Sequence, residues 1–408
     1  MTTRRDLLRA AAALPIAAPA LLDSARADEP RPAGSLLDRD LIYLNHASIG
    51  TAPAEVIDLA SRLARETERN PWLHVWGGAR ADEIEQARTD VAAVIGARPD
   101  NVARLRTTTE AMNLLAQGLP LEPGDEVLFS NLNHDGASRC FEHWGRRLGY
   151  QTRSFALPIE RARDLTEAEV IDLHTREIRP NTRVLVLPTI DNTVGMRHPV
   201  RAIADAARQN GVDLVLADAA QSVGMEPVDV RTLGVDALAT SAHKWLQSPK
   251  CHGLAWFTQD VIDRLEPMVV TWGQRRWDGT ARALEDWGTH DPTAWPVLAE
   301  CVRLQSNLAA DTERRARLAA RVRERASDDP DFALRSPADP ALATPISAVE
   351  VVGRSSADVF RRLFRDRAPS DRKLVFRAFA EPLNACRISV NTGNTIDQID
   401  TFFRHAPG

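Results

Sequence analysis

Two residues of the sequence, Asp218 and Lys244, stand where a carboxylate and an amine could act together. Asp218 ends the largely apolar run 212–217, and Lys244 follows a second such run, 235–240, after a Ser-Ala-His tripeptide. Short runs of this kind are typical of buried parallel strands, and open α/β sheets bind ligands at the carboxyl ends of their strands. We therefore expect both side chains to reach one crevice.

An amine and a carboxylate in one crevice suit the chemistry of pyridoxal phosphate (PLP). Lysine can form a Schiff base with the cofactor aldehyde. A buried carboxylate keeps the pyridine nitrogen protonated, so that the ring accepts electrons from a carbanion. An exposed lysine and a strand-end aspartate that caps a helix or turn are the alternative, and the neighbouring residues decide between the two.

The segments Asp218-Ala-Ala-Gln221 and Ser241-Ala-His243-Lys244 resemble the cofactor signature of the class V aminotransferase family of fold-type I PLP enzymes. This family includes cysteine desulfurases, isopenicillin-N-epimerase-like proteins and C–S lyases. The resemblance implies that Lys244 binds PLP covalently and moves the Cα proton, and that Asp218 pairs with the pyridinium nitrogen. Gln221, Ser241 and His243 are expected to contact the cofactor.

The resemblance also implies a fold. We expect an α/β, fold-type I PLP-dependent transferase with a mainly parallel, seven-stranded type of sheet in a large domain, followed by a small C-terminal α/β domain. The expected divisions are a signal peptide (1–27), an N-terminal segment packing with the small domain (28–80), the large domain (81–296) and the small domain (297–408). A long charged helix is expected from Val297 to about Arg325.

Hydroxyl residues open an expected helix after a short strand at 102–105. Thr107 at the N-cap with Glu110 behind it fits a capping box, and the free N–H groups of the first turn make an anion site. In the family the corresponding threonines hold the cofactor phosphate, which assigns that role to Thr108 and Thr109. A plain helix start is the alternative.

Three further positions match family cofactor contacts. His134 corresponds to the residue whose imidazole stacks on the cofactor ring in many members. Asn192 lies in a turn after a buried strand and corresponds to the residue that reaches the cofactor's phenolic oxygen or the substrate carboxylate. Thr289, in a Gly-Thr-x-Asp-Pro segment, corresponds to a threonine that contacts the phosphate held by the other subunit, which predicts a homodimer with shared sites.

Two residues are expected to bind the substrate. Asn45 lies in the segment Tyr43–Gly50, which resembles the family's N-terminal segment near the substrate. Arg387, on an expected inner strand, matches the arginine that clamps the substrate carboxylate, and a guanidinium can do so through two parallel hydrogen bonds. Structural roles in a turn and on a half-buried strand are the alternatives.

Residues 1–27 resemble an export signal. Arg4-Arg5 fits a twin-arginine motif, residues 10–22 are weakly apolar and too short to span a membrane, and Ala25-Arg-Ala27 fits a cleavage site. The prediction is cleavage after Ala27, a periplasmic or secreted protein with no stable membrane anchor, and transient contact with the twin-arginine machinery. A disordered basic start is the alternative.

Composition excludes some classes of partner. The net charge is −5, and removal of residues 1–27, which hold four Arg and two Asp, leaves −7. This charge argues against a nucleic-acid surface and gives no reason to expect binding to anionic membranes. The four cysteines show neither C-x-x-C nor metal-ligand spacing, so no metal site is expected.

The expected function is that of an exported PLP enzyme acting at the Cα or amino group of an amino acid or peptide-borne amino acid, by aminotransferase-like or epimerase-like chemistry. The segments around Asn45, Trp272 and Thr289 look closest to the isopenicillin-N-epimerase-like branch. A cysteine desulfurase is disfavoured because Cys386 directly precedes Arg387 in the expected strand and could not reach a substrate sulfur. A C–S lyase acting by β-elimination and a non-catalytic binding protein are the alternatives.

Overall fold

The computed structural model describes residues 34–305, 307–368 and 371–408. The predicted signal peptide and its cleavage site after Ala27 lie outside these residues. Within the described part, no helix combines the length and the apolar character that crossing a membrane requires.

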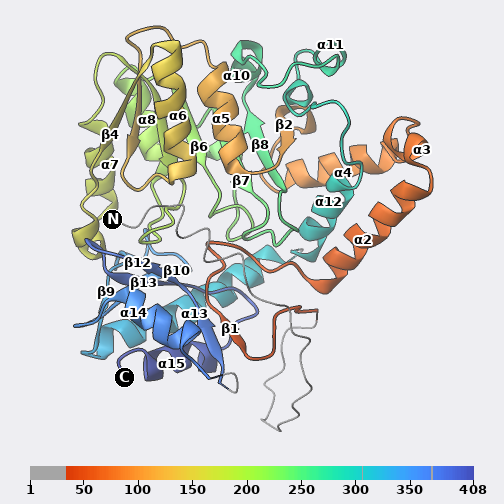
Figure 1. Ribbon diagram of the computed structural model, residues 1–408. Helices are drawn as coiled ribbons and strands as arrows, with labels where there is room; N and C mark the ends of the chain where they lie inside the picture. Colours follow the sequence, from red (N-terminus) through yellow and green to blue (C-terminus); the bar gives the residue numbers. More distant parts are fainter. Residues whose placement is uncertain (1–33, 306, 369–370) are drawn as a thin grey trace. The chain divides into compact units, whose positions relative to one another are not determined.

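A seven-stranded sheet forms the centre of the larger part of the structure (Figure 1). Its strand order is β2-β8-β7-β6-β5-β3-β4, and every neighbouring pair is parallel except the two that involve β8. The expected mainly parallel seven-stranded sheet is thus confirmed. Its strands are β2 (Val102–Leu105), β3 (Glu126–Ser130), β4 (Gln151–Phe155), β5 (Thr182–Pro188), β6 (Leu214–Asp218), β7 (Ala237–Ser241) and β8 (Gly253–Phe257).

Alternation along β6 divides the core into two layers. Leu214 and Leu216 join one buried apolar cluster, whereas Val215 and Ala217 join the other, because successive strand side chains point to opposite faces. Helices cover both faces (Figure 1). The helices of this part are α4 (Ala81–Ala93), α5 (Thr108–Gly118), α6 (Asp135–Leu148), α7 (Glu167–Thr175), α8 (Val200–Gln209), α9 (Val230–Leu233), α10 (Gln259–Arg264) and α11 (Gly273–Arg276), with 3₁₀ turns at Pro99–Asn101, Ile159–Asp164 and Ala281–Leu284.

A four-stranded antiparallel sheet follows in the C-terminal part, in the order β12-β13-β10-β9. The strand that carries Arg387 lies inside this sheet, as expected. The strands are β9 (Phe332–Leu334), β10 (Ile346–Val351), β12 (Arg377–Phe379) and β13 (Ala385–Ser389), and the helices are α13 (Leu308–Asp328), α14 (Ser356–Phe360), the π-helical turn Arg361–Arg365 and α15 (Ile396–His405).

The N-terminal segment contacts both parts. Strand β1 (Leu41–Tyr43) pairs in parallel with β11 (Lys373–Val375). Helix α2 (Ala54–Arg69), which is followed by α3 (Pro71–Val75), packs on α12 (Ala294–Leu304). The expected boundary between residues 296 and 297 falls inside α12, and the domain division remains a prediction.

The expected single helix from Val297 to about Arg325 is wrong, because two helices occupy this stretch. Helix α12 ends at Leu304, and α13 begins at Leu308. The side-chain amide of Gln305 donates to the carbonyl oxygen of Trp245 at 2.6 Å, and the side chain of Asn307 accepts from the N–H of Ala310 at the start of α13. Tertiary contact and capping therefore break the helix where the sequence has neither Gly nor Pro.

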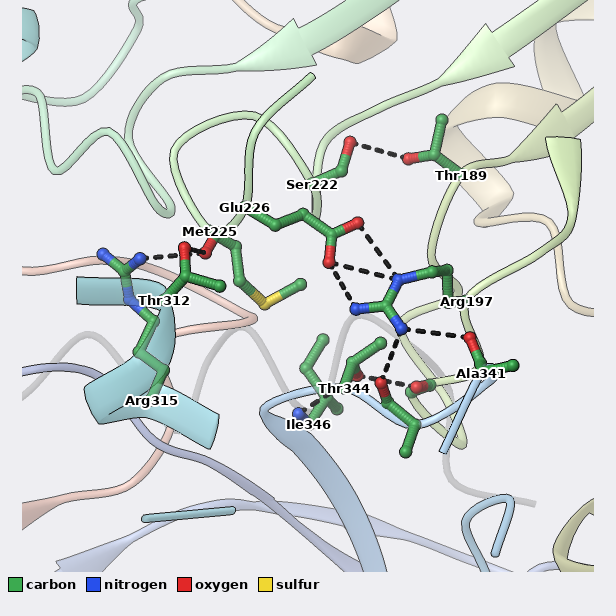
Figure 2. A network of polar contacts seen from close by, with 12 residues as sticks. Thr189, Arg197, Ser222, Met225, Glu226, Thr312, Arg315, Ala341, Thr344 and Ile346 are labelled. Atoms are coloured by element: carbon green, nitrogen blue, oxygen red, sulfur yellow. Dashed lines mark hydrogen bonds and ion pairs between the residues drawn. The ribbon is translucent and has the colours of Figure 1, made fainter. Parts of the chain in front are cut away.

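A polar network joins the loop after β5 to the C-terminal part (Figure 2). The guanidinium of Arg197 pairs with Glu226 at 2.5 Å and donates to the carbonyl oxygens of Ala341 and Ala343. From α13, Arg315 donates to the carbonyl oxygen of Met225 at 2.9 Å. These bonds connect the C-terminal part to the loops that follow β5 and β6, near the carboxyl end of β6 where Asp218 lies.

Candidate active site

A pocket of about 320 Å³ lies at the carboxyl ends of the neighbouring strands β6 and β7. Side chains from both sheets and from the N-terminal segment line it. Of the twelve predicted site residues, the pocket brings together Thr108, Thr109, His134, Asn192, Asp218, Gln221, Ser241, His243, Lys244 and Arg387.

Asp218 and Lys244 reach this pocket from neighbouring strands, as the sequence predicts. One oxygen of the buried Asp218 carboxylate accepts the N–H of Ala220 at 3.0 Å. Burial lowers the pKa of the Lys244 amine to about 8, although the negative charge of Asp218 opposes the shift, and the charge of Arg387 adds to it. A lysine with a lowered pKa is more often the neutral amine that can attack an aldehyde or take up a proton.

The first turn of α5 meets the end of β7. The N–H of Thr108 donates to the hydroxyl oxygen of Ser241 at 2.9 Å, and the two hydroxyl groups lie 2.9 Å apart. Thr107 caps the helix by accepting from the N–H of Glu110, but the carboxylate of Glu110 accepts from the backbone N–H of Arg106. The predicted capping box is therefore only half formed, because the carboxylate reaches one residue further back.

His134 stands at the start of α6, facing the pocket. Its Nδ1 accepts from the N–H of Gly136 at 3.0 Å, and burial, followed by the charge of Lys244, lowers the pKa of the ring. The imidazole is thus neutral and flat. A Cβ at Gly136 would lie 2.5 Å from Oγ1 of Thr109, so a larger residue there would have to displace this hydroxyl group.

Gln221 and His243 differ in the hydrogen bonds that they make within the protein. The carboxamide of Gln221 accepts from the indole N–H of Trp245 at 2.8 Å and donates to the carbonyl oxygen of Ala47 at 2.9 Å. One amide hydrogen is left over. Nδ1 of His243 is buried without a hydrogen-bond partner, and burial lowers the pKa of this ring to about 4.

Arg387 is 2% exposed and is held by three hydrogen bonds. Nη1 donates to the carbonyl oxygen of Asn192 at 2.5 Å, and Nη2 donates to Oδ1 of Asn45 at 3.0 Å and to the hydroxyl of Ser48. Nε is buried without a partner. Of the five N–H bonds, the protein therefore leaves unused one on the buried Nε and one on Nη1. Asn45 does not line the pocket but positions Arg387, and Asn192 uses its backbone for the same purpose.

The turn that presents Asn192 is shaped by Asp191. The fully buried carboxylate of Asp191 accepts the N–H groups of Thr193, Val194 and Met196 at 2.7–2.8 Å. Burial raises the pKa of this carboxyl to about 6, against the effect of those bonds.

Thr289 lies outside the pocket of its own chain and is exposed. Conversely, Arg377 and Phe379 of β12 line the pocket but were missed in the sequence. Their strand has only three residues, and so short a segment carries no periodic signal.

The pocket suits PLP on several grounds. The hydroxyl groups of Thr108 and Thr109 and the N–H of Thr109, at the start of α5, offer donors to a phosphate. The carboxylate of Asp218 suits a protonated ring nitrogen, and Nδ1 of His243 has no hydrogen-bond partner among the described residues. The neutral ring of His134 can stack on an aromatic face.

The chain belongs to the aminotransferase class-V family, which matches residues 42–402. It is a PLP-dependent enzyme with the fold-type I architecture, so the alternative of a non-catalytic binding protein is set aside. When bound, PLP supplies an aldehyde that links to amino groups and a ring that accepts electrons from Cα.

Among its relatives is the isopenicillin N epimerase of Amycolatopsis lactamdurans, which is 29% identical over 381 residues, covering 89% of this chain and 94% of that protein. A probable cysteine desulfurase of Methanothermobacter thermautotrophicus is 31% identical over 241 residues, covering 58% and 57% of the two chains. The fold is also that of a C–S lyase variant with glycine covalently linked to PLP (TM-score 0.78, 18% identity, 90% and 97% covered).

Proposed function

We propose that this protein is an exported enzyme that acts at the Cα or amino group of an amino acid or of a peptide-borne amino acid, with aminotransferase-like or epimerase-like chemistry. The observation that carries the proposal is the meeting of Lys244, Asp218 and Arg387 in one pocket. Similarity to isopenicillin N epimerase along nearly the whole chain supports this branch of the family.

Each of the three residues has a separate task in this proposal. Lys244, with its lowered pKa, takes a proton from Cα and returns it. Asp218 holds a proton on the cofactor ring by its negative charge. Arg387 holds the substrate carboxylate by its charge and its free Nη1 N–H, and a fixed carboxylate decides which Cα bond faces Lys244.

Neither Cys301 nor Cys386 suits the nucleophile of a persulfide-forming desulfurase. Cys386 is fully buried in β13, and burial raises the pKa of its thiol to about 12. Cys301 is 2% exposed with the same shift in pKa. Thiols of this kind are not thiolate nucleophiles. A C–S lyase remains the alternative, because β-elimination from a cysteine conjugate needs no protein cysteine.

The proposal also includes the oligomeric state and the export of the protein. We propose a homodimer in which Thr289 completes the phosphate site of the partner. Its exposure and its place outside the pocket of its own chain support this role. The twin-arginine pattern in residues 1–27 supports export to the periplasm or beyond.

Mass spectrometry tests the proposed function. The holoenzyme is incubated in D₂O with a panel of amino acids, short peptides and cysteine conjugates. Deuterium at Cα, inverted configuration or a keto acid supports the proposal. Pyruvate with a released sulfur fragment supports the C–S lyase instead. Lys244→Ala, which removes the amine, is the negative control, and equal exchange by this variant would exclude Lys244 as the acting base.

A further inference from the structure

Two arginines lie side by side on neighbouring strands of the small sheet, next to the pocket. Strand β12 pairs antiparallel with β13, and Arg377 lies directly opposite Arg387 in the register. Both residues line the pocket. Both guanidinium groups also lie over the same ring, at 5.6 Å and 5.7 Å from the centroid of Phe379. Like charges directly opposite in a sheet destabilise it, so this pair needs a reason.

The two arginines are held very differently. Arg387 is buried and fixed by bonds to Asn45, Ser48 and Asn192. Arg377 is exposed, and within the described chain its guanidinium makes no hydrogen bond and no ion pair. Among the described residues that line the pocket, Asp218 is the single acidic one, and its proposed partner is the cofactor ring. A substrate carboxylate bound by Arg387 would therefore leave the guanidinium of Arg377 without an acidic partner from the protein.

We infer that Arg377 forms a second anion subsite, and that the substrate is an amino acid or peptide-borne amino acid with a further carboxylate near the one bound by Arg387. The inference deepens the proposed function and rests on the proposed role of Arg387. Both guanidinium groups lie within 5.7 Å of the centroid of Phe379, so one small substrate can reach both if its two carboxylates are joined by a short chain, as in aspartate, glutamate or 2-aminoadipate. Arg377 is then a specificity-determining residue.

The first test compares matched substrates in the holoenzyme. Deuterium exchange at Cα is measured for L-glutamate against L-glutamine and for L-2-aminoadipate against L-norleucine. We expect the acidic member of each pair to exchange faster. In Arg377→Gln, the rate of exchange of the acidic members should fall about tenfold or more, as loss of a charge-assisted hydrogen bond implies. The rate for the neutral members should change less than about threefold, because they make no such bond.

A matched control removes a charge elsewhere. Arg354→Gln changes an exposed arginine outside the pocket, and it should keep the wild-type preference for acidic substrates. An equal loss for acidic and neutral substrates in Arg377→Gln would show a structural role and overturn the inference. Equal exchange of both members of each pair by the wild-type enzyme would overturn it as well.

A binding measurement separates this inference from the proposed function. Calorimetry compares glutarate, which has two carboxylates and no amine, with butyrate. The wild-type enzyme should bind glutarate more tightly, and Arg377→Gln should abolish the difference. Glutarate binding of this kind without Cα exchange of any amino acid would refute the proposed function but leave the subsite standing. Equal affinity for glutarate and butyrate in the wild-type enzyme would refute the subsite alone.

Discussion

Gly50 lies against the backbone of Lys244. Its N–H donates to the carbonyl oxygen of His243 at 2.8 Å, and an added Cβ would stand 1.8 Å from the carbonyl oxygen of Lys244. Only glycine fits between the two segments. The N-terminal segment thereby fixes the backbone that carries the predicted catalytic lysine.

Replacement of Gly50 by Ala should displace this backbone, because the atom in the way is a main-chain oxygen and cannot rotate aside. We expect weaker PLP binding and a large loss of turnover, measured by cofactor titration and steady-state kinetics. Gly353→Ala is the control, since Gly353 has a positive φ of 74° but open space around it. It should cost about 1 kcal/mol of stability and leave activity unchanged. Normal PLP affinity in Gly50→Ala would refute the positioning role.

Asp218→Asn should keep the fold and lower turnover by orders of magnitude. The amide oxygen can still accept the N–H of Ala220, but a neutral side chain cannot hold a proton on the ring nitrogen electrostatically. Single-turnover kinetics with unfolding curves separates the two effects. Asp213→Asn, at a carboxylate paired with Arg264 on the surface, should behave as the wild type. Near-normal turnover in Asp218→Asn would contradict the electron-sink role.

Arg387→Lys should fail almost as badly as Arg387→Ala, because an ammonium group cannot reproduce the bonds that hold the planar guanidinium to Asn45, Ser48 and Asn192. By analogy with buried charged pairs, the loss in kcat/KM corresponds to about 2–5 kcal/mol. Circular dichroism must confirm folding, since Asn45 and Ser48 lose a partner in both variants. If kcat/KM for the true substrate stays within a few-fold, its carboxylate is held elsewhere.

Mixing two inactive variants tests the shared site. In Lys244→Ala the lysine is missing, and in Thr289→Ala the predicted phosphate contact is missing. In a mixed dimer, Lys244 of one subunit and Thr289 of the other would complete one intact site. Activity should therefore rise after unfolding and refolding the variants together. Lack of recovery, or a fully active monomer in sedimentation, would disprove the shared arrangement.

Acid should destabilise the fold through buried histidines. His198 and His174 contact each other edge-to-face at 5.5 Å, and burial lowers the pKa of His198 well below 6.5 and that of His174 to about 4. The unfolded chain then binds protons first, so this stability is present above about pH 6.5 and falls with decreasing pH, by up to about 1.4 kcal/mol per pH unit for each histidine.

His198→Leu should therefore flatten the pH dependence of stability between pH 6.5 and 4.5, as measured by urea unfolding. Both ring nitrogens of His198 are buried without a partner, so leucine sacrifices no hydrogen bond. The exposed His143 is the control, and His143→Gln should keep the wild-type profile. An unchanged profile in His198→Leu would assign the acid sensitivity to other groups.

Patterns in the sequence predicted the parts of the structure that depend on the residue types of a short stretch of chain. The apolar runs that end at Asp218 and before Lys244 are buried strands, and ten predicted residues share one pocket. Such strands need a continuous apolar sequence, and their carboxyl ends meet at one edge of the sheet by topology. Residue type and order therefore suffice for them.

Features set by distant contacts escaped prediction. The end of α12 depends on a bond from Gln305 to Trp245, sixty residues earlier in the chain. The carboxylate of Glu110 bonds the backbone of Arg106 instead of that of Thr107. The place of Arg377 follows from its register with Arg387. None of these partners can be read from local periodicity.

The bond between Arg387 and Asn45 joins residues that are 342 positions apart, and the N–H of Ser389 donates to the carbonyl oxygen of Leu44 at 2.8 Å. Chains are synthesised from the N-terminus, so Asp218 and Lys244 leave the ribosome well before β13 does. All seven strands of the large sheet precede β13 in the chain, so a chain that ends before β13 contains these strands but lacks Arg387, the predicted anchor for a substrate carboxylate. If Arg387 has this role, catalytic competence arrives only at the end of translation.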